Sequence, residues 1–310
     1  MTLAPRPASY QPNPRIPIIL FLVFLLTAVL IGAVAGPILF LNFIYIGLMV
    51  SLGQYLMDHL PKKKWLNGRR LSQFGVGIYM LAFLGLFARE NMQLEGFWFV
   101  LFSGAFSGAV VHYTVSKIVG PLVIGRSWCG MACWTGMILD VLPFKRSPGR
   151  YPGWGWLRYA HFALSFALIA FLWFGLSYQP EQGFNLQLLI WFAAGNLFYY
   201  GTAIGLAYAL KDNRAFCKYV CPVTVPLKLG ARFSLLRVHA DPAACNDCKA
   251  CEKLCPMDVP LTDYIQHNQR IASDECILCQ TCVHTCAKGA LGLTFDLDAA
   301  PQYPLRRPAK

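Results

Sequence analysis

The sequence predicts an all-α polytopic membrane domain of about six transmembrane helices, followed by a small α+β domain at its carboxyl end. Hydrophobic residues make up 56% of the chain and charged residues 14%, whereas soluble domains average about 45–50% and about 25%. Eight of the twelve cysteines, by contrast, lie within residues 245–286. We therefore expect an amino-terminal tail, a membrane domain, a cysteine-rich domain and a disordered tail, at residues 1–15, 16–236, 237–296 and 297–310.

Six apolar stretches have the length that a bilayer-spanning helix needs, which is about 20 residues. In chain order they are residues 16–35, 38–57, 71–88, 97–119, 159–178 and 186–210. Gly36 and Pro37 separate the first two stretches and predict a tight helical hairpin. The third stretch is the shortest of the six.

The loops between these stretches differ in their positive charge. The loops on one side contain sixteen Lys and Arg residues and lie at 61–70, 120–158 and 211–237. Residues 89–96 and 179–185, on the other side, contain only Arg89. Because Lys and Arg are enriched in cytoplasmic loops, this asymmetry predicts a multi-pass protein of the bacterial cytoplasmic (inner) membrane, with both termini in the cytoplasm. The net charge of +12 thus lies at the ends of apolar segments, which argues against nucleic-acid binding.

The carboxyl-terminal cysteines repeat one spacing. The run Cys-x2-Cys-x2-Cys-x3-Cys begins at Cys245 and again at Cys276, and disulfide frameworks and zinc sites do not use this triplet spacing. It is the run of bacterial two-cluster ferredoxins, in which the fourth cysteine of each run binds the other run's [4Fe-4S] cluster. The predicted ligand sets are Cys245, Cys248, Cys251 and Cys286 for one cluster, and Cys276, Cys279, Cys282 and Cys255 for the other. The small domain is therefore predicted to be ferredoxin-like, with flanking strands at 238–241 and 291–295.

Four further cysteines form two short pairs. Cys129 and Cys133 follow one apolar hairpin, and Cys217 and Cys221 follow the next, 88 residues later. The equal spacing and position indicate two copies of one unit. Three interpretations stay open: a shared metal or iron–sulfur site that would form a third centre, dithiol–disulfide chemistry, and packing of small buried side chains.

Two histidines, His112 and His161, lie within or near apolar segments, where ionisable residues are functional candidates. Either could contact a quinone headgroup, bind haem or form a hydrogen bond between helices. The sequence contains no Cys-x-x-Cys-His, G-x-G-x-x-G or P-loop motif, so neither c-type haem nor a nucleotide is expected here.

The cysteine motifs together resemble a known family. Trp128-Cys129-Gly130 with Cys133, then Cys217-x3-Cys221-Pro222, then two ferredoxin runs, are similar to the membrane-bound 4Fe-4S ferredoxin proteins of the NapH/NosR type. The resemblance covers about residues 71–295 and implies two [4Fe-4S] clusters, a paired CxxxCP element and service as a quinol dehydrogenase subunit. Trp134 stands where that family has Pro after the first pair, and Ala287 replaces the usual Pro after the second run.

The sequence therefore predicts a membrane-bound iron–sulfur protein that passes electrons between the quinone pool and a redox partner protein. It would act as an electron-transfer subunit of a quinol/quinone oxidoreductase system, in contact with membrane lipid. The alternative is a metal or thiol reductase for cofactor assembly or redox sensing, in which the clusters serve the short cysteine pairs. The direction of electron flow stays open.

Overall fold

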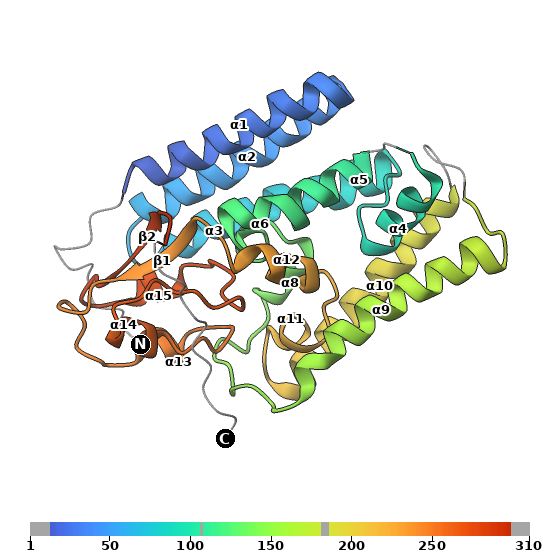
Figure 1. The fold of residues 1–310 in the computed structure, drawn as a ribbon. Helices are drawn as coiled ribbons and strands as arrows, with labels where there is room; N and C mark the ends of the chain where they lie inside the picture. Colours follow the sequence, from blue (N-terminus) through green and yellow to red (C-terminus); the bar gives the residue numbers. More distant parts are fainter. Residues whose placement is uncertain (1–12, 106–107, 181–185, 299–310) are drawn as a thin grey trace.

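A computed structural model describes residues 13–105, 108–180 and 186–298 (Figure 1). Most of the two predicted tails, residues 1–12 and 299–310, lies outside this part of the chain. The described chain begins with the predicted hairpin, formed by α1 (Arg15–Ala35) and α2 (Pro37–His59), which pack side by side. Gly36 makes the turn with a φ of 95°, and Pro37 occupies the first turn of α2, where its missing N–H is harmless.

The described residues contain five helical segments that are long and apolar enough to cross a membrane. They are α1; α2; Trp65–Phe87, made of α3 (Trp65–Ile78) and η1 (Tyr79–Phe87); Trp154–Gly175, made of η3 (Trp154–Trp156), α9 (Leu157–Ala170) and η4 (Phe171–Gly175); and α10 (Leu186–Leu210). These segments correspond to five of the six predicted stretches.

The remaining stretch, 97–119, is not one continuous helix, so that prediction is wrong. The chain forms α4 (Leu94–Ser103) and then a second apolar helix, Gly108–Ile124, built from α5 (Gly108–Tyr113), η2 (Thr114–Val119) and α6 (Gly120–Ile124). Gly104 ends α4 in the left-handed region at φ 69°, which glycine adopts without steric cost. Hydropathy alone did not detect this break because the Gly/Ser segment around it is apolar enough for a bilayer.

Four short helices lie at one end of the long helices. They are α7 (Ser127–Met131), α8 (Trp134–Leu139), α11 (Ala215–Tyr219) and α12 (Thr224–Ala231), and they carry or flank the two short cysteine pairs. The carboxyl-terminal module packs beside them (Figure 1).

The carboxyl-terminal module contains two strands and three short helices. In chain order these are β1 (Leu236–Ala240), α13 (Ala250–Lys253), α14 (Leu261–Gln266), α15 (Thr281–Thr285) and β2 (Leu291–Phe295). The strands pair antiparallel, with Leu236 opposite Phe295 and Ala240 opposite Leu291. The first strand begins two residues before the predicted position, and the second matches it.

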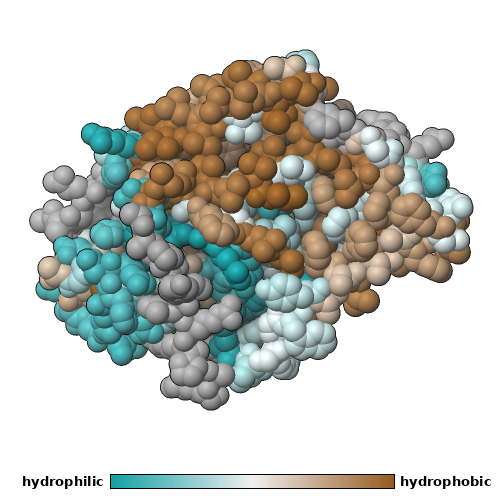
Figure 2. Space-filling model, in the orientation of Figure 1, coloured by the Kyte–Doolittle hydropathy of each residue, from teal (hydrophilic) through white to brown (hydrophobic). Residues whose placement is uncertain are grey.

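The surface separates into an apolar and a polar region. Figure 2 shows a continuous hydrophobic band over the long helices and a hydrophilic surface over the carboxyl-terminal module. Large apolar side chains are widely exposed on the long helices, for example Leu197 at 77% and Ile38 at 72%. Contiguous apolar surface of this extent is rare on soluble monomers and marks a membrane protein.

Candidate iron–sulfur sites

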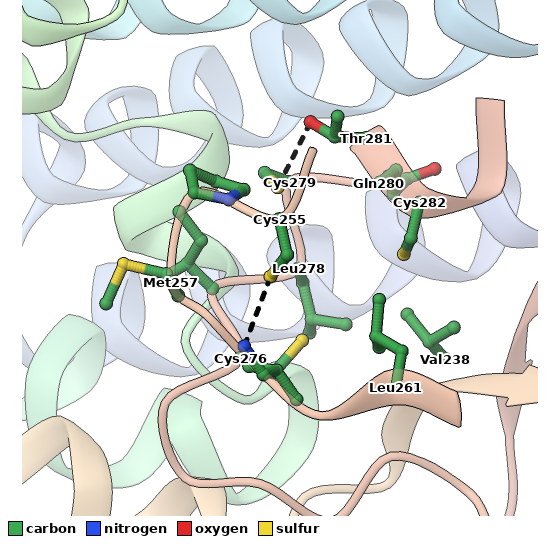
Figure 3. Close-up of a pocket in the computed structure, with 13 residues that line it drawn as sticks. Val238, Cys255, Met257, Leu261, Cys276, Leu278, Cys279, Gln280, Thr281 and Cys282 are labelled. Carbon is green, nitrogen blue, oxygen red and sulfur yellow. Dashed lines mark hydrogen bonds between the residues drawn. The ribbon is translucent and has the colours of Figure 1, made fainter. Parts of the chain in front are cut away.

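The carboxyl-terminal module contains two cavities that are each lined by four cysteines. One is lined by Cys255, Cys276, Cys279 and Cys282, and Val238 and Leu261 complete its wall (Figure 3). The other is lined by Cys245, Cys248, Cys251 and Cys286. The structure thus brings together the two crossed sets that the spacing predicts, with the fourth cysteine of each run in the other run's cavity.

The two runs share one backbone conformation. Asp247 and Lys249, on either side of Cys248, have φ angles of 51° and 57°, and Leu278 and Gln280, on either side of Cys279, have φ angles of 50° and 59°. A short helix follows each of these loops, α13 in the first run and α15 in the second. Residues other than glycine rarely adopt positive φ. The recurrence of positive φ angles at matching positions indicates that the two loops fold around the same kind of ligand.

Backbone amides donate to the sulfur atoms of the crossing cysteines. The Val259 nitrogen lies 3.5 Å from Cys255 Sγ, and the Ala290 nitrogen lies 3.3 Å from Cys286 Sγ. Burial raises the pKa of the Cys255 thiol to about 12 and that of Cys276 to about 11. Thiols in such surroundings keep their protons until a metal replaces them, so loading these sites releases protons.

The donor atoms in both cavities are all sulfur. Each cavity is lined by four cysteines, and none of its other lining residues is a His, Asp or Glu. A [4Fe-4S] cluster is held by four cysteine thiolates. The all-thiol donor sets of the two cavities therefore fit [4Fe-4S] clusters.

The two short cysteine pairs meet in one group, in which Cys129 and Cys217 are buried and Cys133 and Cys221 are partly buried. Cys129 lies in α7, Cys133 directly precedes α8, and Cys217 lies in α11, followed by Cys221. Burial raises the pKa of Cys133 to about 11, and it also raises the pKa values of Cys217 and Cys221. The neighbouring thiols add to each of these shifts, because thiolates close together repel one another. We call these four residues the four-cysteine site.

The two halves of the four-cysteine site repeat one local structure. Helices α7 and α11 are both five residues long and begin 88 positions apart, each directly after an arginine, Arg126 or Arg214. Arg214 Nη1 lies 3.8 Å from Cys217 Sγ, and Arg126 interacts with Cys129 in the same way. This agreement supports the predicted two copies of one unit.

A third buried cation faces the four-cysteine site. Lys117 is 3% exposed, and its Nζ lies 3.2 Å from the centroid of the Trp128 ring. The ammonium interacts electrostatically with Cys129, Cys133 and Cys221, and it makes no hydrogen bond to any residue that the structure describes. Burying a charge without a counter-ion is costly. The three cations, Lys117, Arg126 and Arg214, therefore suit a site that holds negative charge.

The membrane domain touches the second ferredoxin run at Gly130. A β-carbon at this position would collide with the Ile277 carbonyl oxygen and would lie 3.1 Å from the Cys279 backbone nitrogen. The Gly130 carbonyl accepts hydrogen bonds from Arg69 Nε at 2.9 Å and Gln73 Nε2 at 3.1 Å. Only glycine allows the loop of the four-cysteine site to pack directly on the backbone of Cys279.

Ion pairs fix the ferredoxin module on the membrane domain. Glu275, directly before Cys276, lies 3.0 Å from Arg126, 3.0 Å from Arg158 and 2.6 Å from Lys228. Burial alone would raise the pKa of Glu275, but these cations and Arg150 hold it well below its usual value. Several loop cations that predict orientation are thus buried partners of this carboxylate.

A second carboxylate, Asp140, links α3 to the segments that carry the two short cysteine pairs. Asp140 pairs with Arg69 and lies 2.6 Å from Arg214 Nη2, the arginine that precedes α11. Burial would raise the pKa of Asp140, but Arg214 and Arg69 bring it below the ordinary value. The carboxylate thereby fixes the arginine that approaches Cys217.

The two candidate histidines each lie beside one loop of the four-cysteine site. His112 packs edge-on against Trp128, and its ring nitrogens lie 3.4 Å from Asn42 Nδ2 and 3.2 Å from Ser116 Oγ. Both nitrogens are therefore engaged within the helix bundle. His161 Nδ1 lies 2.9 Å from the carbonyl oxygen of Val220, the residue before Cys221.

Sequence reasoning did not single out Glu95, Tyr113 or Tyr199, which the structure places near His161 and Cys221. Glu95 lies in the predicted loop 89–96, two residues before a predicted span. The structure places it in the first turn of α4, where it accepts a hydrogen bond from Tyr199 of α10. A carboxylate directly before an apolar run, with tyrosines in the neighbouring runs, is the signal that could have indicated it.

The fold and these sites define a membrane protein that carries a 4Fe-4S dicluster domain. A family model described as a 4Fe-4S dicluster domain matches residues 237–287, which include both ferredoxin runs. A second model, described as a 4Fe-4S binding domain, matches residues 117–150 and 197–238. Each of these two segments contains one of the short cysteine pairs.

The chain belongs to the same family as the uncharacterized protein MJ0749 of Methanocaldococcus jannaschii. The two are 40% identical over 196 residues, which are 60% of this chain and 71% of that protein. The putative electron transport protein YccM of Escherichia coli is 23% identical over 207 residues, 61% of this chain and 56% of its own length. The NAD(P)H-quinone oxidoreductase subunit I of Gloeobacter violaceus is 29% identical over 72 residues, 20% of this chain and 34% of its own length. No solved structure matches the chain.

Proposed function

We propose that this protein is a membrane-bound iron–sulfur electron carrier of the NapH/NosR type, which passes electrons between the quinone pool and a redox partner protein. The observation that carries the proposal is the pair of cavities in the ferredoxin module, each of which is lined by four cysteines. This module contacts the membrane domain at Gly130. The similarity to a putative electron transport protein and to a quinone oxidoreductase subunit supports it. The loop charges favour the cytoplasmic side of a bacterial inner membrane for the module.

The two ferredoxin runs would supply the ligands of two [4Fe-4S] clusters, which accept and donate single electrons when bound. The proposed sets are those that line the two cavities: Cys245, Cys248, Cys251 and Cys286, and Cys255, Cys276, Cys279 and Cys282. The Val259 and Ala290 amides donate to the sulfurs of the crossing cysteines. Hydrogen bonds of this kind, with burial, set the reduction potential of such clusters.

We extend the proposal to a third iron–sulfur centre at the four-cysteine site. The three buried cations around the thiols would compensate the negative charge of such a centre. Four thiols, two from each copy of the repeated unit, are the number of ligands that an iron–sulfur cluster needs. The match of the 4Fe-4S binding domain model to both segments that carry these pairs supports a bound centre over the thiol-reductase alternative.

The contacts support one order for the proposed electron path. The four-cysteine site meets Cys279 through Gly130, so the cavity that contains Cys279 is nearest to the membrane domain. Cys282 of that cavity interacts with Cys251 of the other cavity, which places the two cavities side by side. Cys248, in the second cavity, is exposed and marks the side where a soluble partner protein would dock.

Iron content and EPR spectra test the number of centres. We expect about twelve irons per wild-type chain and about eight in the quadruple variant C129S/C133S/C217S/C221S, because each cubane contains four irons. The variant should lose one EPR signal and keep both ferredoxin signals. Equal iron content and unchanged spectra in the two proteins would exclude a third centre and leave the two-cluster proposal intact.

Reduction by a quinol tests the link to the quinone pool. In detergent or nanodiscs, duroquinol should bleach the iron–sulfur absorbance of the wild-type protein within the time of a stopped-flow or slow-mixing experiment. If the reduction potentials oppose this direction, the dithionite-reduced protein should instead reduce duroquinone. If duroquinol does not reduce the oxidised protein and the reduced protein does not reduce duroquinone, the quinone proposal is refuted.

A further inference from the structure

A group of polar side chains is buried where four helices of the membrane domain meet. Glu95 begins α4, Tyr113 ends α5, His161 lies in α9 and Tyr199 lies in α10. Tyr199 donates a hydrogen bond to Glu95 Oε1 at 3.2 Å, and His161 and Tyr113 both interact electrostatically with the Glu95 carboxylate. Ionisable groups inside a membrane domain are rare and are functional candidates.

Part of this polar group has no protein partner. Glu95 Oε2 and the Tyr113 hydroxyl are buried and make no hydrogen bond within the described structure. The Ser165 hydroxyl approaches the same carboxylate without forming a bond of normal geometry. Buried polar atoms in folded proteins are nearly always satisfied. A free acceptor beside a free donor therefore points to a ligand that has both an acceptor and a donor oxygen.

His161 links this group to the four-cysteine site. A carbonyl oxygen can only accept, so His161 Nδ1 carries the proton that it shares with Val220, and in the corresponding tautomer Nε2 is the acceptor nitrogen. Tyr113 and Tyr199 both interact electrostatically with Cys221, which follows Val220. An electron donor bound among these residues would lie directly beside the four-cysteine site.

His161 connects this group to the apolar surface, whereas Tyr113 and Tyr199 are buried. His161 is half-buried between α9 and α10, and the Phe198 ring lies edge-on to it at 5.9 Å. Phe198 is 54% exposed on the apolar face of α10. A lipid-soluble ligand could therefore reach His161 from the bilayer without passing through water.

We infer that Glu95, Tyr113, His161 and Tyr199 form the quinol/quinone site of this protein. The inference rests on the proposed exchange of electrons with the quinone pool and gives that exchange a location. A quinol hydroxyl donates to Glu95 Oε2 and a quinone oxygen accepts from the Tyr113 hydroxyl, so the two unpartnered atoms match the two forms of the ligand. Tyr199 positions the carboxylate through its hydrogen bond to Oε1.

The protons and electrons of quinol oxidation balance at this site. One hydroxyl proton passes to Glu95 Oε2 and the other to His161 Nε2. The two electrons would pass one at a time to the iron–sulfur centre proposed at the adjacent four-cysteine site, and from there to the clusters proposed in the ferredoxin module. The ligand becomes the quinone, and no bond between heavy atoms forms or breaks. Quinone reduction reverses each of these steps.

The test replaces the proton acceptor and leaves the iron–sulfur centres intact. Glu95→Gln is expected to slow duroquinol-driven bleaching about 10²-fold, the typical contribution of a positioned acid–base group. Reduction by dithionite, iron content and EPR spectra should stay at wild-type values. Glu90→Gln serves as the matched control, because Glu90 lies in the segment just before α4 and Tyr199 donates its hydrogen bond to Glu95.

The outcomes separate this inference from the proposed function. If wild type and Glu95→Gln react with duroquinol at the same rate, the site is wrong while the quinone proposal stands. If wild-type protein with intact clusters does not react in either direction, both fail. If the Glu95→Gln variant loses its clusters, the Tyr199→Phe variant is used instead. This variant should raise the KM for duroquinol several-fold and keep wild-type spectra. An unchanged KM would overturn the inference.

Discussion

Replacement of Gly130 with leucine is expected to disconnect the four-cysteine site from the ferredoxin module without removing either ferredoxin cluster. The new side chain would occupy the space of the Ile277 carbonyl oxygen and the Cys279 backbone. The loop must then move outward, which lengthens the path between the four-cysteine site and the ferredoxin module and slows electron transfer between them. Stopped-flow spectra should show slow reduction of the ferredoxin clusters by duroquinol and normal reduction by dithionite.

Gly155→Leu provides the matched control for this experiment. A β-carbon at Gly155 meets no atom within 4 Å, so the larger side chain changes composition without disturbing a contact. This variant should reduce its clusters at the wild-type rate. If Gly130→Leu retains all its iron and is reduced by duroquinol as fast as Gly155→Leu, electrons do not pass through this contact.

Glu275→Gln is expected to destabilise the docking of the ferredoxin module by about 3–5 kcal/mol, the usual cost of removing one partner from a buried ion pair. The substitution keeps the shape of the side chain but removes the charge that Arg126, Arg158 and Lys228 share. Arg126 and Arg158 would then lose this counter-ion, and Lys228 would keep only Asp274, at 3.5 Å. Hydrogen exchange should show faster labelling of α12 and of the loop before Cys276, and thermal unfolding should begin at a lower temperature.

Asp241→Asn is the control for the loss of one negative charge in the same module. Asp241 is exposed and accepts a hydrogen bond from the Ala243 amide at 2.9 Å, which asparagine can also accept. Its exchange pattern and melting temperature should match those of the wild type within about 0.5 kcal/mol, as for most surface substitutions. Glu275→Gln with wild-type exchange and melting would show that the ion pairs do not hold the module in place.

The fold class could be predicted because membrane helices depend mainly on local composition. Five long apolar segments occur where hydropathy predicts them, including the hairpin at Gly36. The break at Gly104 was not predictable in this way, because both sides of it are apolar. Whether a helix continues through such a segment depends on the neighbours that pack on it, and composition does not contain that information.

The two ferredoxin sets were predictable for a different reason. A CxxC turn has so few residues that its cysteines must face one centre, and the fourth ligand must then come from elsewhere. Cys286 and Cys255 accordingly line the cavities of the other run. The positions of Lys117 and Glu95 were not predictable, because each contacts residues that are distant in sequence, such as Trp128 and Tyr199.

The sequence by itself determined the membrane class, the two ferredoxin runs and the repetition of the short cysteine pair, because each of these features depends only on local spacing and composition. Only the tertiary structure decided that the four cysteines of the short pairs meet, that Gly130 lies on Cys279, and that Glu95 is buried beside His161. Those contacts depend on how whole helices pack. Packing is decided by surfaces that many distant residues form together, so no single segment reveals it.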